Sequence, residues 1–252
     1  VVYVRNVLGI IPARGGSKSI PKKSIAPIAG KPLMSYTIKV AQSSRFITRL
    51  IISTDDEELS EVARTLGVEV PFMLPAELAQ DLTPDLPVFQ HALNWLKSHE
   101  GYAPDAVVHL RPTAPMRLPE DIDNAVELLA EHPEADAVHS MCKPLQSPVK
   151  MATVGKDEYL KPLLANEFPE LFKQYREPFN MPRQVLPPIW RHSPLVDVIR
   201  TSTIMDKNSM GGTKVFPLFC DEWRDIDIDS YRELQYAELL IGSLRSKGDM
   251  RW

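Results

Sequence analysis

The sequence predicts one α/β domain with a three-layer, doubly wound and mostly parallel β-sheet, interrupted by one inserted segment. Two observations predict this fold class. Short apolar runs alternate with amphipathic helical segments from residue 7 to residue 141, and parallel strands need such crossovers between them. The chain has 252 residues, which is enough to bury one full hydrophobic core.

The alternation begins with β-branched residues that end in a proline and are followed by a glycine pair, which is typical of a buried parallel strand that opens into a loop. The predicted elements of this half are a strand at 7–12, a helix at 32–43, a strand at 50–54, a helix at 57–66 and a strand at 68–70. Gly67 is expected to cap the second helix at its carboxyl end.

The second half of the alternation leads into the insertion. Its predicted elements are a helix at 85–98, a strand at 106–110, a helix at 121–131 and a strand at 135–141. From about residue 144 to 195 the chain is rich in Pro, Lys, Arg and aromatic residues, which predicts an inserted segment. Alternation resumes over 196–204 and 215–218, and residues 231–244 form an amphipathic closing helix.

Charge and cysteine content narrow the class of protein. The net charge of −4 gives no reason to expect a nucleic-acid or membrane partner, since both favour a basic surface. Cys142 and Cys220 are too few for a disulfide framework and suit a reducing compartment. Residues 1–9 resemble neither a signal peptide nor an anchor, so we expect a cytoplasmic protein.

The loop after the first strand has the composition of a phosphate site. Residues 11–24 read IPARGGSKSIPKKS, and ligands of parallel sheets bind beyond the carboxyl ends of strands. Gly15 and Gly16 lack the Cβ atoms that would keep backbone N–H groups away from phosphate oxygens. The cations expected to neutralise a triphosphate are Arg14, Lys18 and Lys23. The P-loop and GxGxxG motifs are both absent, so a solvated basic turn is the alternative.

The order of residues in this loop is more specific than its composition. IIPARGGSK, followed by Lys23 and by GKPL, closely resembles the signature loop of the CMP-sugar synthetases, in particular the acylneuraminate (sialic-acid type) cytidylyltransferases. The resemblance continues through STD at 53–55, PAELA at 75–79, LRPTAPMR at 110–117 and DIDIDSYRELQYAE at 225–238. It implies a Rossmann-like nucleotidyltransferase that transfers CMP from CTP to an acidic 2-keto sugar and releases pyrophosphate. The nucleotide-binding residues it implies are Ala13, Arg14, Gly15, Gly16, Ser17, Lys18, Lys23, Ser24, Asp81 and Arg111.

An acidic segment near the end of the chain predicts a magnesium site. In an extended chain alternate residues share a face, which puts Asp225, Asp227 and Asp229 on one side. Magnesium is held by one or two carboxylates together with phosphate oxygens. The resemblance assigns the metal to Asp227 and Asp229, and with Arg14 and Lys23 they form the expected catalytic set. An exposed strand end, or a cap ahead of the last helix, is the alternative.

The insertion carries candidates for binding the acidic sugar. By the resemblance these are Lys150, Arg183, Gln184 and Arg191, and the guanidinium fork of arginine suits a carboxylate. Solvated cations on an irregular segment are the alternative. The same resemblance implies that the insertion reaches a second subunit in a homodimer.

The chain departs from the family pattern near the nucleoside and near the sugar. Ser24 stands where the family usually has Asn, and Leu74 where it has Arg. No Asn-Gly pair follows Arg191, as it does in the sialic-acid enzymes. These departures leave open another nucleoside triphosphate, or an acceptor such as Kdo, a legionaminic-type sugar, a sugar 1-phosphate or a phosphonate. A nucleotide-binding protein without catalysis is a further alternative.

The six histidines show no HxxxH or HExxH spacing, so the sequence suggests no zinc site. His109 and His139 lie in apolar strand runs and are expected to be core residues.

Overall fold

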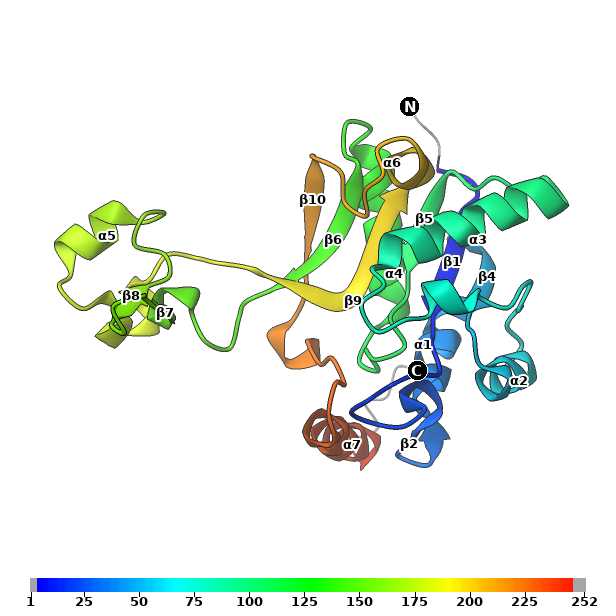
Figure 1. Ribbon diagram of the computed structural model, residues 1–252, viewed down its shortest axis with the longest axis horizontal. Helices are drawn as coiled ribbons and strands as arrows, with labels where there is room; N and C mark the ends of the chain where they lie inside the picture. The colour runs from blue at the N-terminus through cyan, green and yellow to red at the C-terminus, as the bar shows by residue number, and fades with distance from the viewer. Residues whose placement is uncertain (1–3, 247–252) are drawn as a thin grey trace.

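The computed structural model describes residues 4–246, and a six-stranded sheet lies at its centre (Figure 1). The strand order is β10-β6-β9-β5-β1-β4. The strands are β1 (Val7–Pro12), β4 (Ile47–Ser53), β5 (Ala106–His109), β6 (Ala137–Cys142), β9 (Arg191–Arg200) and β10 (Val215–Phe219). Neighbours run parallel except β9, which pairs antiparallel with β5 and β6, so the predicted mostly parallel sheet is confirmed.

Helices cover both faces of the sheet, as the doubly wound prediction requires. The helices are α1 (Leu33–Gln42), α2 (Glu57–Thr65), α3 (Asp85–Glu100), α4 (Pro119–Glu131), α5 (Pro169–Gln174), α6 (Thr201–Met205) and α7 (Tyr231–Ser246), and α5 and α7 lie outside the two apolar clusters that flank the sheet. Side chains of α1, α2 and α4 share one apolar cluster with the sheet, and those of α3 and α6 share the other. Helix α2 ends at Thr65, and Gly67, two residues later, has the positive φ of 78° expected of a glycine that terminates a helix.

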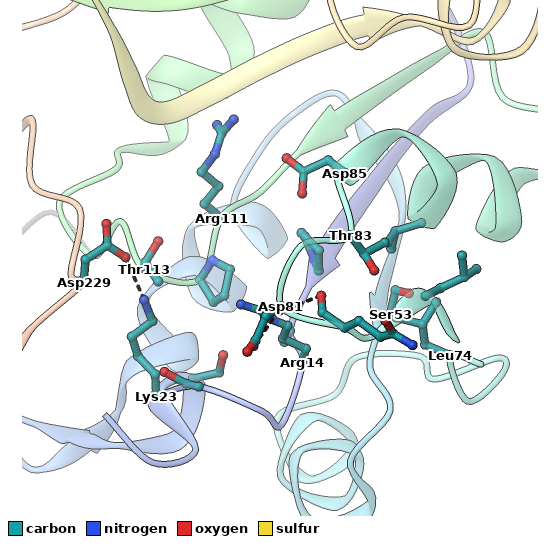
Figure 2. Close-up of a pocket in the computed structure, with 18 of the residues that line it drawn as sticks. Arg14, Lys23, Ser53, Leu74, Asp81, Thr83, Asp85, Arg111, Thr113 and Asp229 are labelled. Carbon is teal, nitrogen blue, oxygen red and sulfur yellow. Dashed lines mark hydrogen bonds and ion pairs between the residues drawn. The ribbon is translucent and has the colours of Figure 1, made fainter. Parts of the chain in front are cut away.

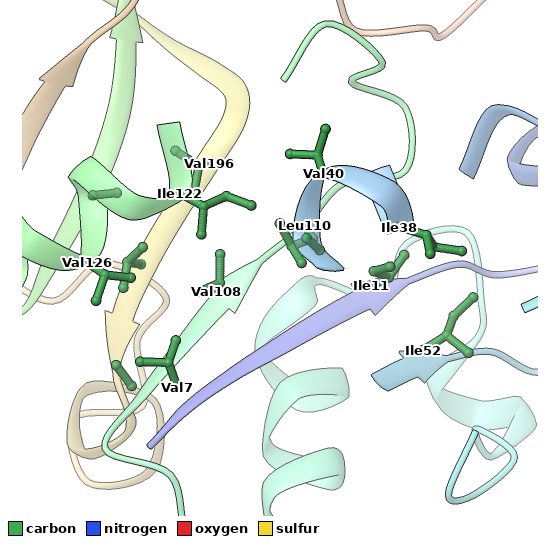
Figure 3. Close-up of a cluster of buried hydrophobic side chains, with 14 of the residues drawn as sticks. Val7, Ile11, Ile38, Val40, Ile52, Val108, Leu110, Ile122, Val126 and Val196 are labelled. Atoms are coloured by element: carbon green, nitrogen blue, oxygen red, sulfur yellow. The ribbon is translucent and has the colours of Figure 1, made fainter. Parts of the chain in front are cut away.

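The first strand shows how the sequence builds these two layers. Val7 and Ile11 belong to the cluster with α1 (Figure 3). Leu8 and Ile10 belong to the cluster with α3. Successive side chains of a strand point to opposite faces, so a strand that is apolar throughout must be covered on both sides.

Two predicted strands differ in the structure. Residues 68–70 form no strand, because Glu69 makes only an isolated bridge with Ile51, and a second isolated bridge joins Thr54 to Met73. Pro71 lies between these bridges and has no N–H to donate, which interrupts the ladder. Strand β9 begins at Arg191, inside the predicted insertion, and gives way to α6 at Thr201.

The segment between β6 and β9 extends away from the sheet as an arm, residues 143–190 (Figure 1). It contains the small hairpin β7 (Ala152–Val154) and β8 (Leu160–Pro162), the helix α5 and short 3-10 turns. Apolar side chains are exposed along it, including Leu145, Tyr159 and Leu160.

A second hairpin, β2 (Pro27–Ile28) with β3 (Lys31–Pro32), lies beside α7, and both pack on the buried Ile226 and Ile228. None of the helices within residues 4–246 combines the length and the apolar character needed to cross a membrane.

Candidate active site

A cavity of about 570 Å³ opens at the carboxyl ends of three neighbouring strands, β1, β4 and β5 (Figure 2). Pro12, Ser53 and His109, the last residues of these strands, line it. The predicted nucleotide and metal residues that line it are Ala13, Arg14, Ser17, Lys18, Lys23, Ser24, Asp81, Arg111, Asp227 and Asp229. Residues from both ends of the chain therefore share one cavity.

Asp81 holds two loop cations at the cavity wall. Arg14 Nη1 lies 3.2 Å from Asp81 Oδ1 and donates to the Gln80 carbonyl at 2.7 Å, and Lys18 pairs with Asp81 Oδ2. The hydrogen bond from Lys18, supported by Arg14, lowers the pKa of the Asp81 carboxyl below its ordinary value. The third cation, Lys23, donates to Asp229 Oδ1 at 2.8 Å.

The two glycines of the loop have different surroundings. The Gly15 N–H donates to Asp55 Oδ1 at 2.9 Å, so here it faces a carboxylate and not the cavity. A Cβ at Gly15 would lie 2.6 Å from Asp56 Oδ2, which explains why glycine is needed there. An added Cβ at Gly16 would meet nothing within 4 Å. Neither glycine lines the cavity.

The acidic segment has the alternation that the sequence predicts. Ile226 and Ile228 are buried, and the Ile228 N–H donates to the Thr113 carbonyl at 2.9 Å. Among the described residues no partner is found for the buried Asp227 Oδ1. Burial raises the pKa of Asp227, and Asp229 adds to this, although a hydrogen bond with Thr113 opposes it.

Two arginine–aspartate pairs hold the acidic segment in place. Arg224 and Asp121 form a bidentate pair, with Nη2 and Oδ1 at 2.9 Å, and both side chains are less than a tenth exposed. Arg191 pairs with Asp225 Oδ2, with its Nε at 3.0 Å. Arg191 was expected to bind the sugar, but in this chain it is bound to the segment that carries Asp227.

A polar cluster that sequence reasoning missed lies beside Arg111. The buried Asp197 accepts from Arg111 Nη1 at 2.9 Å and from His192 Nε2 at 2.7 Å. His109 lies 3.8 Å from Asp85, and both line the cavity. Burial raises the pKa of Asp85 and lowers that of His109 well below the ordinary value. The sequence does contain one signal for this cluster, which is a charged or polar residue inside a run of apolar strand residues.

The remaining sugar candidates lie on the arm and not in the cavity. Arg183 and Gln184 line a separate cavity of about 360 Å³, and Lys150 ends a 3-10 turn, Pro148–Lys150. Arg183 donates to the Leu145 carbonyl of the same arm. Within one chain the structure does not bring them to Arg14 or Lys23.

Residues 8–194 match a family described as cytidylyltransferase. The chain belongs to the cytidylyltransferase family. The resemblance on which the sequence analysis relied is thereby confirmed.

The curated relatives that the chain resembles include enzymes named for acidic sugars. It is 41% identical over 120 residues to a pseudaminic acid cytidylyltransferase of Campylobacter jejuni, covering 48% of this chain and 51% of that protein. It is 36% identical over 122 residues to a CMP-N,N'-diacetyllegionaminic acid synthase of Legionella pneumophila, covering 48% and 52%. The chain thus spans about half the length of these relatives. The chain is also 27% identical over 237 residues to post-translational flagellin modification protein B of Campylobacter coli, and this match covers 93% of the chain and 94% of that protein.

Solved structures support the fold. A CMP:2-keto-3-deoxy-manno-octonic acid synthetase in complex with CTP superposes with a TM-score of 0.67 at 14% identity, covering 94% of this chain and 99% of that one. A 4-diphosphocytidyl-2C-methyl-D-erythritol synthase of Anaerococcus prevotii superposes with a TM-score of 0.59 at 12% sequence identity, covering 94% of this chain and 99% of that one. The Rossmann-like nucleotidyltransferase fold is therefore confirmed.

Proposed function

We propose that this protein transfers CMP from CTP to an acidic 2-keto sugar of the nonulosonate type and releases pyrophosphate. The observation that carries the proposal is the shared cavity in which Lys23 lies 2.8 Å from Asp229, with Arg14 and Lys18 on the same wall. The family and the relatives named for pseudaminic and legionaminic acids support the choice of cytidine and of an acidic acceptor.

The cavity has one end suited to a base and another suited to phosphates. Leu74, Leu78 and Val88 give it an apolar wall, and Figure 2 places Leu74 on the opposite side from Lys23. Nucleotide pockets pair apolar contact for the base with a few fixed polar groups. The triphosphate is therefore assigned to the loop cations, and the base to the side of Leu74.

Asp227 and Asp229 fit a magnesium ion. Carboxylate oxygens are the donors that magnesium prefers. The buried Oδ1 of Asp227 has no hydrogen-bond partner within residues 4–246, so a bound cation would satisfy it. Bound there, magnesium would polarise the α-phosphate and neutralise charge on the triphosphate.

The residues of the chain supply position and charge. Arg14, Lys18 and Lys23 would stabilise the negative charge of the phosphates as pyrophosphate leaves, and the Arg224–Asp121 pair fixes the segment that bears Asp227. This arrangement requires no covalent protein nucleophile.

The arm is proposed to complete the site of a second subunit. Arg183 and Gln184 lie on the arm, away from the cavity of their own chain, and the arm exposes apolar side chains. In a twofold homodimer each arm reaches the other subunit, and Arg183 would then meet the sugar carboxylate. We further propose a cytoplasmic location, in keeping with the free thiols of Cys142 and Cys220.

Pyrophosphate release tests the function. The protein is incubated with magnesium, each of the four nucleoside triphosphates and a panel of acidic sugars, and products are identified by mass spectrometry. Release with CTP and one nonulosonate, with a CMP-sugar product, is expected. Leu74 stands where the family usually has Arg near the nucleoside, so the four nucleotides must be compared. Activity confined to ATP or GTP would refute the cytidine assignment.

Subunit mixing tests the arm. Asp227→Ala and Arg183→Ala chains are each expected to be inactive, but after unfolding and refolding together they should recover about a quarter of wild-type activity, since half of the dimers are mixed and each has one intact site. No recovery, or a monomer in light scattering, would contradict a shared site.

A further inference from the structure

Three metal-ligand side chains converge on the sheet beside the proposed active site. His139 on β6 and His192 and Asp197 on β9 each present one ligand atom, and these three atoms lie within 4.8 Å of one another. None of these three described residues lines the nucleotide cavity, and the proposed transfer of CMP uses none of them.

An irregularity in β9 builds this convergence. His139 is the cross-strand partner of Asp197, whereas His192 lies opposite Met141, so β9 has extra residues between the two pairs. The hydroxyl of Ser140 fixes this bulge by donating to the Ser193 carbonyl and accepting from the Val196 N–H, both at 3.0 Å. The bulge re-aims His192 toward Asp197, a common use of such irregularities.

A buried arginine secures the bulge from the other side. Arg117 is fully buried and donates to the Leu195 carbonyl and, at 3.2 Å, to the Pro194 carbonyl. The backbone that carries His192 and Asp197 is therefore fixed by neighbours that are not themselves ligands, as a preorganised site requires.

The side chains are already in contact. His192 Nε2 lies 2.7 Å from Asp197 Oδ1, and the rings of His139 and His192 stack with centroids 4.7 Å apart. His139 has a 3.3 Å hydrogen bond to the Met210 carbonyl. Arg111 Nη1 donates to Asp197 Oδ2 at 2.9 Å. This contact fixes the carboxylate and leaves Oδ1 directed at the histidines.

We propose that His139, His192 and Asp197 form a binding site for a transition-metal ion of the zinc class, distinct from the magnesium carboxylates. Two imidazoles and one carboxylate suit zinc, whereas magnesium prefers oxygen donors alone. The His192 side chain is 44% exposed, which gives an entry path and room for a water ligand. With zinc bonds of about 2.0–2.2 Å, tetrahedral ligand atoms lie roughly 3.4 Å apart. Ligand atoms up to 4.8 Å apart must therefore approach one another by about 1.5 Å. The His192 and Asp197 atoms, now 2.7 Å apart, must separate by about 0.7 Å, and the exposed ring of His192 has room for this movement. The guanidinium of Arg111 weakens the carboxylate as a donor, so the affinity is modest.

Zinc binding by the metal-stripped protein tests the proposal. Competition with a chromophoric chelator should show one zinc site whose dissociation constant rises at least about tenfold in both His192→Ala and His139→Ala. His99→Ala removes an exposed histidine on α3 that stacks on Trp95, so it is the matched control and should bind zinc as the wild type does. Asp227→Ala should also keep the site, which separates it from the proposed magnesium site.

Cobalt gives a spectroscopic readout. Cobalt substitution should give the visible absorption of a four-coordinate ion in the wild type, and His192→Ala should abolish it. A wild type that binds no zinc, or zinc affinity unchanged in both histidine variants, would reduce the cluster to a structural hydrogen-bond network and overturn the proposal. The His192 variant alters an exposed side chain, so it serves as the test even if His139→Ala does not fold. The result does not depend on whether the chain transfers CMP.

Discussion

Lys23 Nζ lies 2.8 Å from Asp229 Oδ1, so a lysine that follows the first strand touches a carboxylate 206 residues later in the chain. Lys23 is mostly buried and Asp229 mostly exposed, which places the contact at the mouth of the cavity. This contact joins the basic loop to the proposed magnesium carboxylates.

Lys23→Ala should lower kcat/KM for CTP by about 100-fold, because the transition state would lose a fixed positive charge on its phosphates. Steady-state pyrophosphate release measures the effect. Lys97→Ala, on the exposed surface of α3, is the control and should behave like the wild type. Equal activity in both variants would remove Lys23 from the proposed mechanism.

Gly15→Ala and Gly16→Ala form a matched pair within one loop. A methyl at Gly15 would lie 2.6 Å from Asp56 Oδ2, whereas one at Gly16 meets nothing within 4 Å. Gly15→Ala should therefore reduce the free energy of unfolding by about 1–3 kcal/mol and displace the loop, while Gly16→Ala keeps wild-type stability. Urea unfolding measures the stability of both variants. Equal losses of unfolding free energy would show that the contact with Asp56 is not the reason for glycine at position 15.

Arg224→Ala should cost about 3–5 kcal/mol of unfolding free energy, because it leaves Asp121 buried without its partner. Arg232→Ala is the control: its pair with Glu233 has an arginine that is 90% exposed and should change stability by less than about 1 kcal/mol. Similar stability of both variants in urea titrations would contradict a structural role for the buried pair. The Arg224 variant should also lose CTP turnover, since the segment with Asp227 is displaced.

Asp136 should make stability depend on pH in the acid range. Its carboxyl pairs with Lys207 and accepts from the Thr213 N–H at 2.8 Å. Chiefly the Lys207 contact holds its folded-state pKa below the ordinary value. The stabilisation is therefore complete above the unfolded-state pKa of about 3.9 and is lost as the pH falls below it.

Asp136→Asn should reduce the free energy of unfolding by about 2 kcal/mol at pH 7, and the gap to wild type should narrow as the pH falls below about 4. Urea titrations across this range measure the gap. A gap that stays constant down to pH 3 would rule out the ionised carboxylate as its source.

The layout of the site could be predicted from the sequence because it follows general rules. Loops after parallel strands meet at one edge of the sheet, so the loop of Arg14 was expected to bind a ligand there. The family resemblance added Asp81 and Arg111, which line the same cavity as Arg14. The alternation of Asp225, Asp227 and Asp229 with two isoleucines was visible in the sequence, and the structure retains it with both isoleucines buried.

Other features depend on contacts that no local pattern encodes. The Arg191–Asp225 pair joins the start of β9 to the acidic segment, and no spacing in the sequence predicts this contact. The cluster of His139, His192 and Asp197 was missed because a bulge and a strand pairing assemble it, rather than a helical repeat.

Magnesium-dependent binding of CTP tests the central claim most directly. Isothermal titration of CTP into the wild type should show much tighter binding with magnesium than with EDTA, and Asp227→Asn should remove most of that difference while still folding. If the variant keeps the wild-type dependence on magnesium, the cations of the first loop and the carboxylates of the last segment do not meet around a metal-bound triphosphate.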